Sequence, residues 1–229
     1  MPAWTSRSSS RGRKRIRHEE NAPRAAKAVV FVAALIPLAR LAAGAVLGTL
    51  GANPIEKIIR TTGYWTLSFL LITLAVTPLR IVLKQPWLVR LRRMLGLSAF
   101  FYGLLHFTGY VVLDQFFDWP AILKDIAKRP FITVGFPSFV LLIPLAVTST
   151  DAMMRRLGGK CWRRLHRLVY VSAIGGVIHY LWLVKKDISD PLRFTVLLTA
   201  LLGFRAIVLL RRRARGSNST VLSDRREAG

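Results

Sequence analysis

The stretch from Leu165 to Val184 reads LHRLVYVSAIGGVIHYLWLV and combines a long apolar run with two histidines, His166 and His179. A helix needs about 20 mostly apolar residues to cross the hydrocarbon core of a bilayer. Titratable rings are costly there, so a histidine within such a run usually serves a function. A third histidine, His106, lies in another apolar run, and the only other one, His18, lies in a basic N-terminal arm. The sequence therefore predicts a functional site between membrane helices.

The composition supports a membrane protein. The chain has 229 residues, of which 52% are hydrophobic, yet it carries a formal net charge of +24. A pI near 11.7 would also suit a nucleic-acid-binding protein. The basic residues are split among apolar blocks, however, so we expect no nucleic-acid partner. The single cysteine, Cys161, excludes an intramolecular disulfide and any cysteine-held cluster within one chain.

We predict an all-α, polytopic membrane protein with a bundle of six transmembrane helices. The expected spans cover residues 28–50, 65–83, 95–117, 131–148, 165–184 and 192–210. Together they form one transmembrane domain over residues 28–210. A basic, disordered arm over residues 1–27 and a basic tail over residues 211–229 flank it, and the tail composition also indicates disorder.

The distribution of basic residues predicts the orientation. With six spans, the two termini and two of the loops share one side and hold 25 of the 35 lysines and arginines. The loops on the opposite side hold 8 of them. Because cytoplasmic loops carry the excess of basic residues, both termini are expected in the cytoplasm. Membrane lipid is then an expected partner of the chain.

The third and fifth spans run in the same direction, so depths along them can be compared. His106 and His179 fall at similar depths, whereas His166 precedes His179 by 13 residues, or roughly 20 Å of helix. Imidazole is a common axial ligand of haem iron. We therefore predict that His106 and His179 hold a haem b between the two helices.

The inner end of the bundle leaves two interpretations open. Arg92 precedes His106 by 14 residues, close to four turns, so it shares the face of His106 and lies near the depth of His166. A second haem held by His166, with Arg92 at a propionate, is one interpretation. The other is that Arg92 marks the positive-inside side and His166 lies at the interface. Arg40, within the first span, could similarly bind a propionate or quinone oxygen, or simply reach the interface.

No zinc, thiol, nucleotide or dinucleotide motif occurs in the chain. The sequence therefore predicts no flavin or nicotinamide domain of its own. Its electrons must come from another protein or from a membrane quinone. We interpret the chain as a non-catalytic electron-transfer subunit of an oxidoreductase system.

Several motifs in order carry a resemblance to a known family. They are the stretches 51–56 (GANPIE), 73–80 (TLAVTPLR), 92–97 (RRMLGL), 105–106 (LH), 165–170 (LHRLVY) and 178–182 (IHYLW). Over about residues 30–210 the chain resembles the MsrQ (YedZ) family, the haem-binding membrane subunits of bacterial periplasmic methionine sulfoxide reductase systems. The three histidines of the family motif fall on His106, His166 and His179.

The resemblance implies a ferric reductase-like transmembrane fold, haem b and an association with FMN. It implies electron transfer from the quinone pool or a cytosolic flavin reductase to a periplasmic, molybdopterin-containing catalytic subunit. That subunit reduces methionine sulfoxide in oxidised envelope proteins, and the haem-binding subunit lies in the bacterial inner membrane.

Other classes of protein remain open at this point. A stand-alone transmembrane ferric or quinone reductase would use the same haem site. A proton-coupled transporter would use the histidines as a proton path. The only acidic residue in the predicted spans, Asp114, lies at the end of the third one, so no acidic relay crosses the membrane, and the chain has no internal repeat. A structural membrane anchor would leave the intramembrane histidines unexplained.

Overall fold

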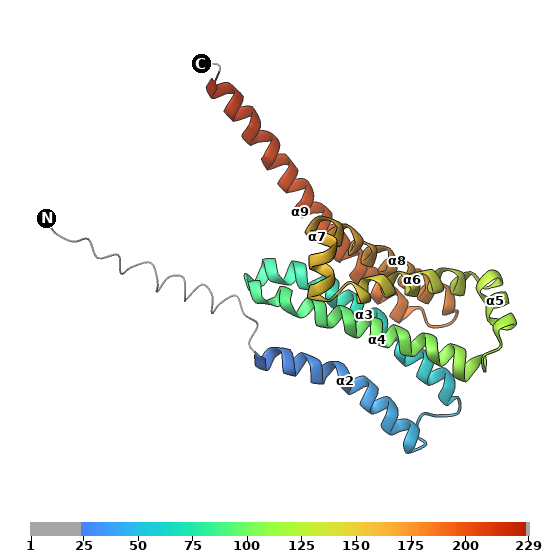
Figure 1. Ribbon diagram of the computed structural model, residues 1–229. Coiled ribbons are helices and arrows are strands. Elements are labelled where there is room, and N and C mark those ends of the chain that lie inside the picture. Colours follow the sequence, from blue (N-terminus) through green and yellow to red (C-terminus); the bar gives the residue numbers. More distant parts are fainter. Residues whose placement is uncertain (1–23, 228–229) are drawn as a thin grey trace.

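The computed structural model describes residues 24–227, and every regular element in that range is a helix (Figure 1). In chain order the helices are α2 (Arg24–Val46), α3 (Pro54–Leu83), η1 (Pro86–Arg90), α4 (Leu91–Gly109), η2 (Tyr110–Asp114), α5 (Trp119–Lys128), α6 (Pro130–Val147), α7 (Asp151–Leu165), α8 (Leu168–Leu183) and α9 (Ser189–Glu227). The all-α prediction is confirmed. Most of the N-terminal arm, including His18, lies outside the described residues.

The helices form a multi-pass membrane bundle. Five segments in the described chain are long and apolar enough to cross a membrane: α2, α3, α4 with its flanking η1 and η2 turns, α6, and the part of α9 up to Arg211. The sixth apolar helix, α8, has 16 residues. Large apolar side chains face outward on all six, as contact with lipid requires; examples are Val29, Ile72, Leu97, Val140, Val171 and Val196.

The second membrane helix begins at Pro54, about three turns before the predicted start. The Asn53 side chain accepts a hydrogen bond from the backbone N–H of Glu56 at 3.1 Å and donates one to the Glu56 carboxylate at 3.0 Å. This reciprocal cap fixes the first turn. The predicted span left out the first turns of α3 because Glu56, Lys57 and Arg60 make them too polar for a hydropathy-based boundary.

The fifth span is shorter than predicted. His166 forms the C-terminal cap of α7, so α8 starts only at Leu168. The third span begins earlier than predicted, because the η1 turn and the start of α4 precede residue 95, and it ends at Asp114 in a π-helical turn over Tyr110–Asp114.

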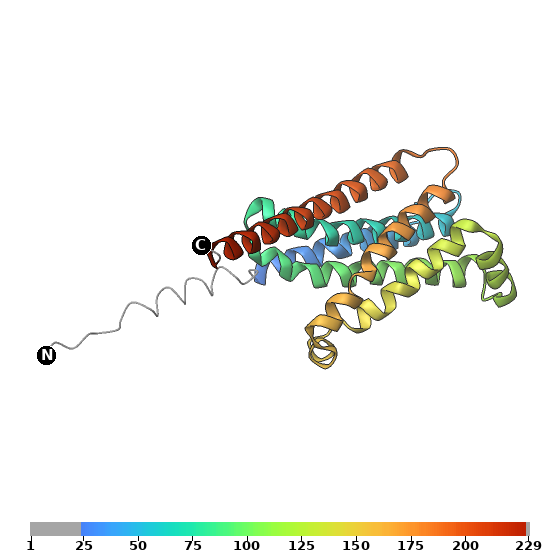
Figure 2. The ribbon, with the colours of Figure 1, turned by 90° about the horizontal axis from the view of Figure 1, so that it is seen from above.

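Two closely packed helix pairs, α3 with α4 and α6 with α8, make the centre of the bundle (Figures 1 and 2). Helix α5 joins α4 to α6 at one end, hereafter the α5 end, and α7 joins α6 to α8 at the opposite, α7 end. Helices α2 and α9 pack on the outside. The core is apolar and includes Leu70, Leu74, Ala99, Tyr102 and Ala173.

A proline in α2 explains how that helix is attached. Pro37 disturbs the helix because its ring crowds the preceding turn. The Tyr102 hydroxyl from α4 accepts a hydrogen bond from the Leu38 N–H at 3.1 Å and donates one to the Ala34 carbonyl at 2.8 Å. The hydroxyl thus replaces a backbone bond of the α2 ladder, an insertion that bends helices.

A second proline prepares a contact with α9. Pro78 in α3 has no N–H, so the carbonyl of Leu74 lacks its helical donor. The Arg205 guanidinium from α9 supplies one, with its Nη2 at 2.7 Å from the Leu74 oxygen. Helix α9 is therefore fastened to α3 by a charged side chain within the membrane part of the bundle.

The C-terminal tail differs from its prediction. Helix α9 continues to Glu227 and projects beyond the α7 end (Figure 1). The residues just after the membrane part, 211–215, are arginines and an alanine, which have high helix propensity. The helix therefore extends where composition alone suggested a disordered segment.

Candidate functional site

His106 from α4 and His179 from α8 face each other near the α5 end. Their ring centroids lie 6.1 Å apart and their planes are inclined by 78°. His106 lies one turn before the end of α4, which a π-helical turn continues to Asp114, and His179 lies one turn before the end of α8. The structure thus brings together the two residues for which equal depth was predicted.

Both rings are held through Nδ1. His106 Nδ1 lies 2.8 Å from the backbone oxygen of Ile59 in α3, and His179 Nδ1 lies 2.6 Å from that of Phe131 in α6. A carbonyl oxygen only accepts, so each Nδ1 carries the proton and donates. Each Nε2 then presents a lone pair, which is the arrangement that orients metal-binding histidines.

A glycine lies beneath each ring. A Cβ added at Gly63 would come within 3.0 Å of His106 Cε1 and Nδ1, and one added at Gly135 within 2.5 Å of His179 Nδ1. Gly63 follows Ile59 by four residues, and Gly135 follows Phe131 by four. The pairs α3–α4 and α6–α8 therefore repeat one device, in which a ring rests on a glycine and bonds the carbonyl one turn earlier.

Two facing imidazoles restrict what the site can hold. Zinc takes four protein ligands in structural sites and three in catalytic sites. Within the described residues, no three histidine, cysteine, aspartate or glutamate side chains are grouped to hold a metal. Haem iron needs only axial ligands from the protein. With metal–nitrogen bonds of about 2.0–2.1 Å, an ion between two imidazoles places the ring centres roughly 6 Å apart, which matches the observed spacing.

The other two predicted site residues lie at the α7 end. The His166 ring stacks on Trp162 with centroids 3.8 Å apart, and its Nδ1 lies 3.1 Å from the Trp162 carbonyl oxygen. Its Nε2 is buried and has no partner in the described chain. Burial lowers the pKa of His166, and the charge of the nearby Arg92 acts in the same direction. His166 is therefore a neutral ring close to Arg92 and remote from the facing pair.

Sequence reasoning missed Gly63, Gly135 and Arg205. Glycines are common within apolar helices, and only the histidine ring packed against each one shows that a side chain there would overlap it. The sequence did contain a signal for Arg205. A charged residue within one span can donate a hydrogen bond to a backbone carbonyl that a proline, here Pro78, leaves without its helical donor in another span. Arg40, the intramembrane arginine that the sequence did single out, is exposed on α2.

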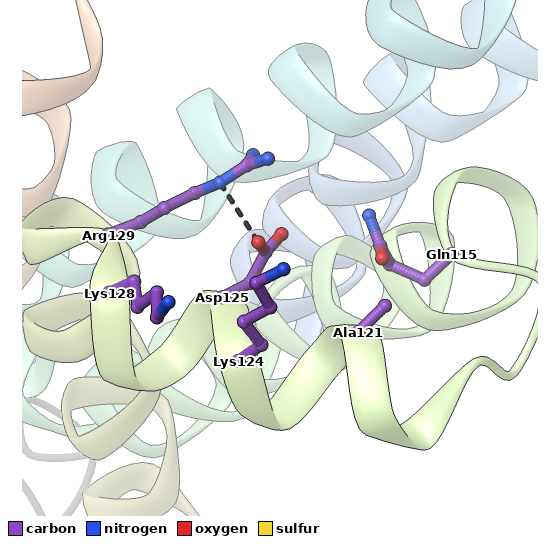
Figure 3. A pocket seen from close by; sticks show the side chains of 6 residues that line it. All are labelled: Gln115, Ala121, Lys124, Asp125, Lys128 and Arg129. Atoms are coloured by element: carbon purple, nitrogen blue, oxygen red, sulfur yellow. Dashed lines mark ion pairs between the residues drawn. The ribbon is translucent and has the colours of Figure 1, made fainter.

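A polar hollow lies at the α5 end (Figure 3). It is lined by Gln115, Ala121, Lys124, Asp125, Lys128 and Arg129. Asp125 pairs with Arg129 at 3.0 Å and accepts a hydrogen bond from the Tyr110 hydroxyl at 3.2 Å. Since Tyr110 follows His106 by one turn, this network joins α5 to the helix that carries the ring.

Comparison with known proteins gives a consistent answer. The family model described as "Ferric reductase like transmembrane component" matches residues 62–177, a range that contains His106 and ends two residues before His179. Three similar proteins bear the name "Protein-methionine-sulfoxide reductase heme-binding subunit MsrQ". The one from Herminiimonas arsenicoxydans is 53% identical over 86% of this chain and 92% of its own length. The one from Rhodospirillum rubrum is 53% identical over 84% and 93%, and the one from Bordetella pertussis 49% identical over 82% and 91%. The chain therefore belongs to the MsrQ family, within the ferric reductase-like transmembrane proteins.

Proposed function

We propose that the chain is a haem-binding electron-transfer subunit of a methionine sulfoxide reductase system. The observation that carries the proposal is the facing pair: His106 and His179, 6.1 Å apart between ring centroids, each with Nδ1 bonded to a backbone oxygen. The names of the relatives, which describe haem-binding subunits of such a system, support it.

The chain's own residues would position the cofactor. The carbonyls of Ile59 and Phe131 fix the ring orientations, and Gly63 and Gly135 allow the rings to lie against neighbouring helices. A haem bound there would supply one-electron redox chemistry. Because the two rings come from different helix pairs, the iron ligands would also join the two halves of the bundle.

The position of the site favours electron exit at the α5 end. His179 lies about one turn from that end of α8, and His106 lies in the last turn of α4, before the π-helical turn that continues to Asp114. We propose that electrons enter from the quinone pool or a cytosolic flavin reductase and leave to a periplasmic, molybdopterin-containing catalytic subunit. The family resemblance also implies FMN, which would carry electrons on the side where they enter the chain. The chain would lie in the bacterial inner membrane and support the repair of oxidised envelope proteins.

A reduced-minus-oxidised absorption spectrum of the purified protein tests this function. We expect the bands of a b-type haem with two imidazole ligands. A protein expressed with sufficient haem but lacking these bands would refute the proposal. Co-purification with a periplasmic catalytic subunit would separate the electron-transfer subunit from a stand-alone ferric or quinone reductase.

The proposed orientation can be tested independently. Helix α2 begins and the membrane part of α9 ends at the α7 end (Figure 1). With six spans, this side holds 25 of the 35 lysines and arginines. We expect both termini in the cytoplasm. Fusions of green fluorescent protein to either terminus should fluoresce, and fusions of alkaline phosphatase should be inactive. An active phosphatase fusion at either end would contradict the assignment.

The residues at the α7 end are proposed to serve electron entry. We expect that His166→Ala leaves the haem of the facing pair in place but slows haem reduction by a cytosolic donor, because His166 lies roughly 20 Å along the chain from His179. Haem content per protein and stopped-flow reduction rates would measure this. Loss of about half the haem would identify His166 as the ligand of a second haem. Unchanged content and an unchanged rate would limit the chain to one redox centre.

A further inference from the structure

The segment that joins η2 to α6, residues 115–129, carries a group of large, exposed apolar side chains. Phe116 and Phe117 are 75% and 55% exposed. Trp119 and Leu123, at the start and in the middle of α5, are 57% and 66% exposed. Apolar side chains gathered on an exposed surface mark a place where a protein contacts something other than water.

The loop before α5 has an unusual backbone that is firmly held. Phe116 and Phe117 have φ angles of 47° and 62°, in the left-handed region that bulky residues rarely adopt. The Phe117 N–H donates to the Val111 carbonyl at 3.0 Å, and the Asp118 carboxylate caps α5 by accepting from the Ala121 N–H at 3.0 Å. Left-handed backbone at such residues is costly and is found mainly at functional sites. The two exposed rings are therefore a built feature of this surface.

Helix α5 continues the exposed apolar surface along one face. Trp119, Leu123 and Ala127 follow one another at intervals of four residues, so they lie in a row, and all three are exposed. Lys124 and Lys128 form a second row beside it and are also exposed. Neither lysine forms an ion pair within the described residues. The outer face thus combines an apolar row with a basic one.

The inner face of α5 is fixed against the bundle, so the direction of the outer face is fixed as well. Ile122 is buried. The Asp125 carboxylate accepts a hydrogen bond from the Tyr110 hydroxyl at 3.2 Å and pairs with Arg129 at 3.0 Å (Figure 3). The apolar and basic rows therefore point away from the bundle.

Both ends of this segment lie where membrane spans end. The span before it ends at Asp114, and the span after it begins at Pro130. Helix α5 lies across the end of the bundle rather than along it (Figure 1), and its 10 residues extend about 15 Å. A short helix tied at both ends to membrane spans stays at the level of the bilayer surface.

The residue types favour a lipid surface over a protein partner. Helices that lie in the membrane interface combine tryptophan, phenylalanine and leucine on one side with lysine or arginine on the other. Protein interfaces are also rich in aromatic residues, but they are depleted in lysine. The basic residues of α5, Lys124 and Lys128, are both lysines.

We propose that residues 116–128 form an interfacial segment that binds anionic phospholipid in the leaflet at the α5 end. Its aromatic and leucine side chains insert among the lipids, and Lys124 and Lys128 bind the headgroup phosphates. The segment lies at the end of the bundle opposite α7. Its contact with lipid requires no cofactor, so the proposal goes beyond the proposed function and does not rest on it.

The depth of the segment is tested with spin labels on the full-length protein in nanodiscs of phosphatidylglycerol and phosphatidylcholine. The single cysteine, Cys161, is replaced by serine, and a nitroxide is attached at Ala127→Cys or at Asp187→Cys. Asp187 is an exposed residue of the α8–α9 loop at the same end. Oxygen concentrates in the bilayer, whereas a nickel chelate stays in water. We expect oxygen to relax the label at position 127 and the nickel chelate to relax the one at position 187.

The headgroup preference is measured at the same place. A fluorophore at Ala127→Cys reports quenching by spin-labelled phosphatidylglycerol and by spin-labelled phosphatidylcholine. A lysine at a membrane surface contributes about fivefold to the binding of anionic lipid, so Lys124→Gln with Lys128→Gln should lower the preference for phosphatidylglycerol at least fivefold. Lys185→Gln with Lys186→Gln removes the same charge from the exposed α8–α9 loop and should leave the preference unchanged.

Three results would overturn the proposal. The first is a label at position 127 that meets the nickel chelate as readily as the one at position 187. The second is equal quenching by the two lipids, or an equal loss in the α8–α9 control. The third is a label that leaves water only when a periplasmic catalytic subunit is added, which would make this surface a protein interface. Haem content does not enter any of these measurements, so the result stands apart from the proposed function.

Discussion

Replacing His106 or His179 with alanine is expected to abolish haem binding at the facing pair, while the protein still inserts into the membrane. Each substitution removes one of the two proposed axial ligands and also the bond to Ile59 or Phe131. Neither ring is needed for the apolar packing that holds the bundle together. Haem per protein, measured by the pyridine haemochrome assay, should fall by at least tenfold at this site.

His18→Ala provides a control at the histidine of the basic N-terminal arm and should retain the full haem content. Membrane fractionation would establish that the variants insert. Wild-type haem content and an unchanged spectrum in both single variants would refute the pairing. Loss in only one of them would mean that the two rings do not share an iron.

Gly135→Ala is expected to have nearly as large an effect, although it adds only one methyl group. The new Cβ would lie 2.5 Å from His179 Nδ1 and 2.9 Å from Cγ, closer than atoms can approach. His179 must then move off the helix and lose its bond to Phe131. Because misplaced support for a metal-binding histidine typically costs 10–100-fold in affinity, we expect haem affinity to fall within that range.

The glycines also predict an order of effects. At Gly63 the added Cβ would be 3.0 Å from the His106 ring, a milder overlap, so Gly63→Ala should weaken haem binding less than Gly135→Ala. Gly203→Ala is the matched control, because nothing lies within 4 Å of its added Cβ. Titration of haem into the three depleted variants would measure the order. Equal affinities across the three would show that the rings do not depend on these glycines.

The sequence was sufficient for the general plan because hydropathy and charge act locally. Apolar runs located the six membrane helices, and the rise per residue put His106 and His179 at equal depth before their helices were known to meet. The boundaries were less accurate where capping decided them. Asn53 starts α3 in a polar segment, and His166 ends α7 where an apolar run appeared to begin.

Contacts between distant segments could not be predicted in the same way. Gly63 and Gly135 matter because of rings that lie 43 and 44 residues further along the chain. The partner of Arg205 is a carbonyl in α3, made available by a missing N–H at Pro78. Neither the glycine–histidine contacts nor the hydrogen bond of Arg205 leaves a periodic pattern or a motif in the sequence, because each depends on how two helices pack.

The short helix α8 has a consequence for the membrane around it. Its 16 residues extend about 24 Å, whereas the hydrocarbon slab of a typical bilayer is about 30 Å thick. Lipid beside a short span adjusts by compressing toward it. The insulating layer is therefore thinnest along the helix that carries His179, and an electron passing there crosses less of the dielectric that separates the two aqueous phases.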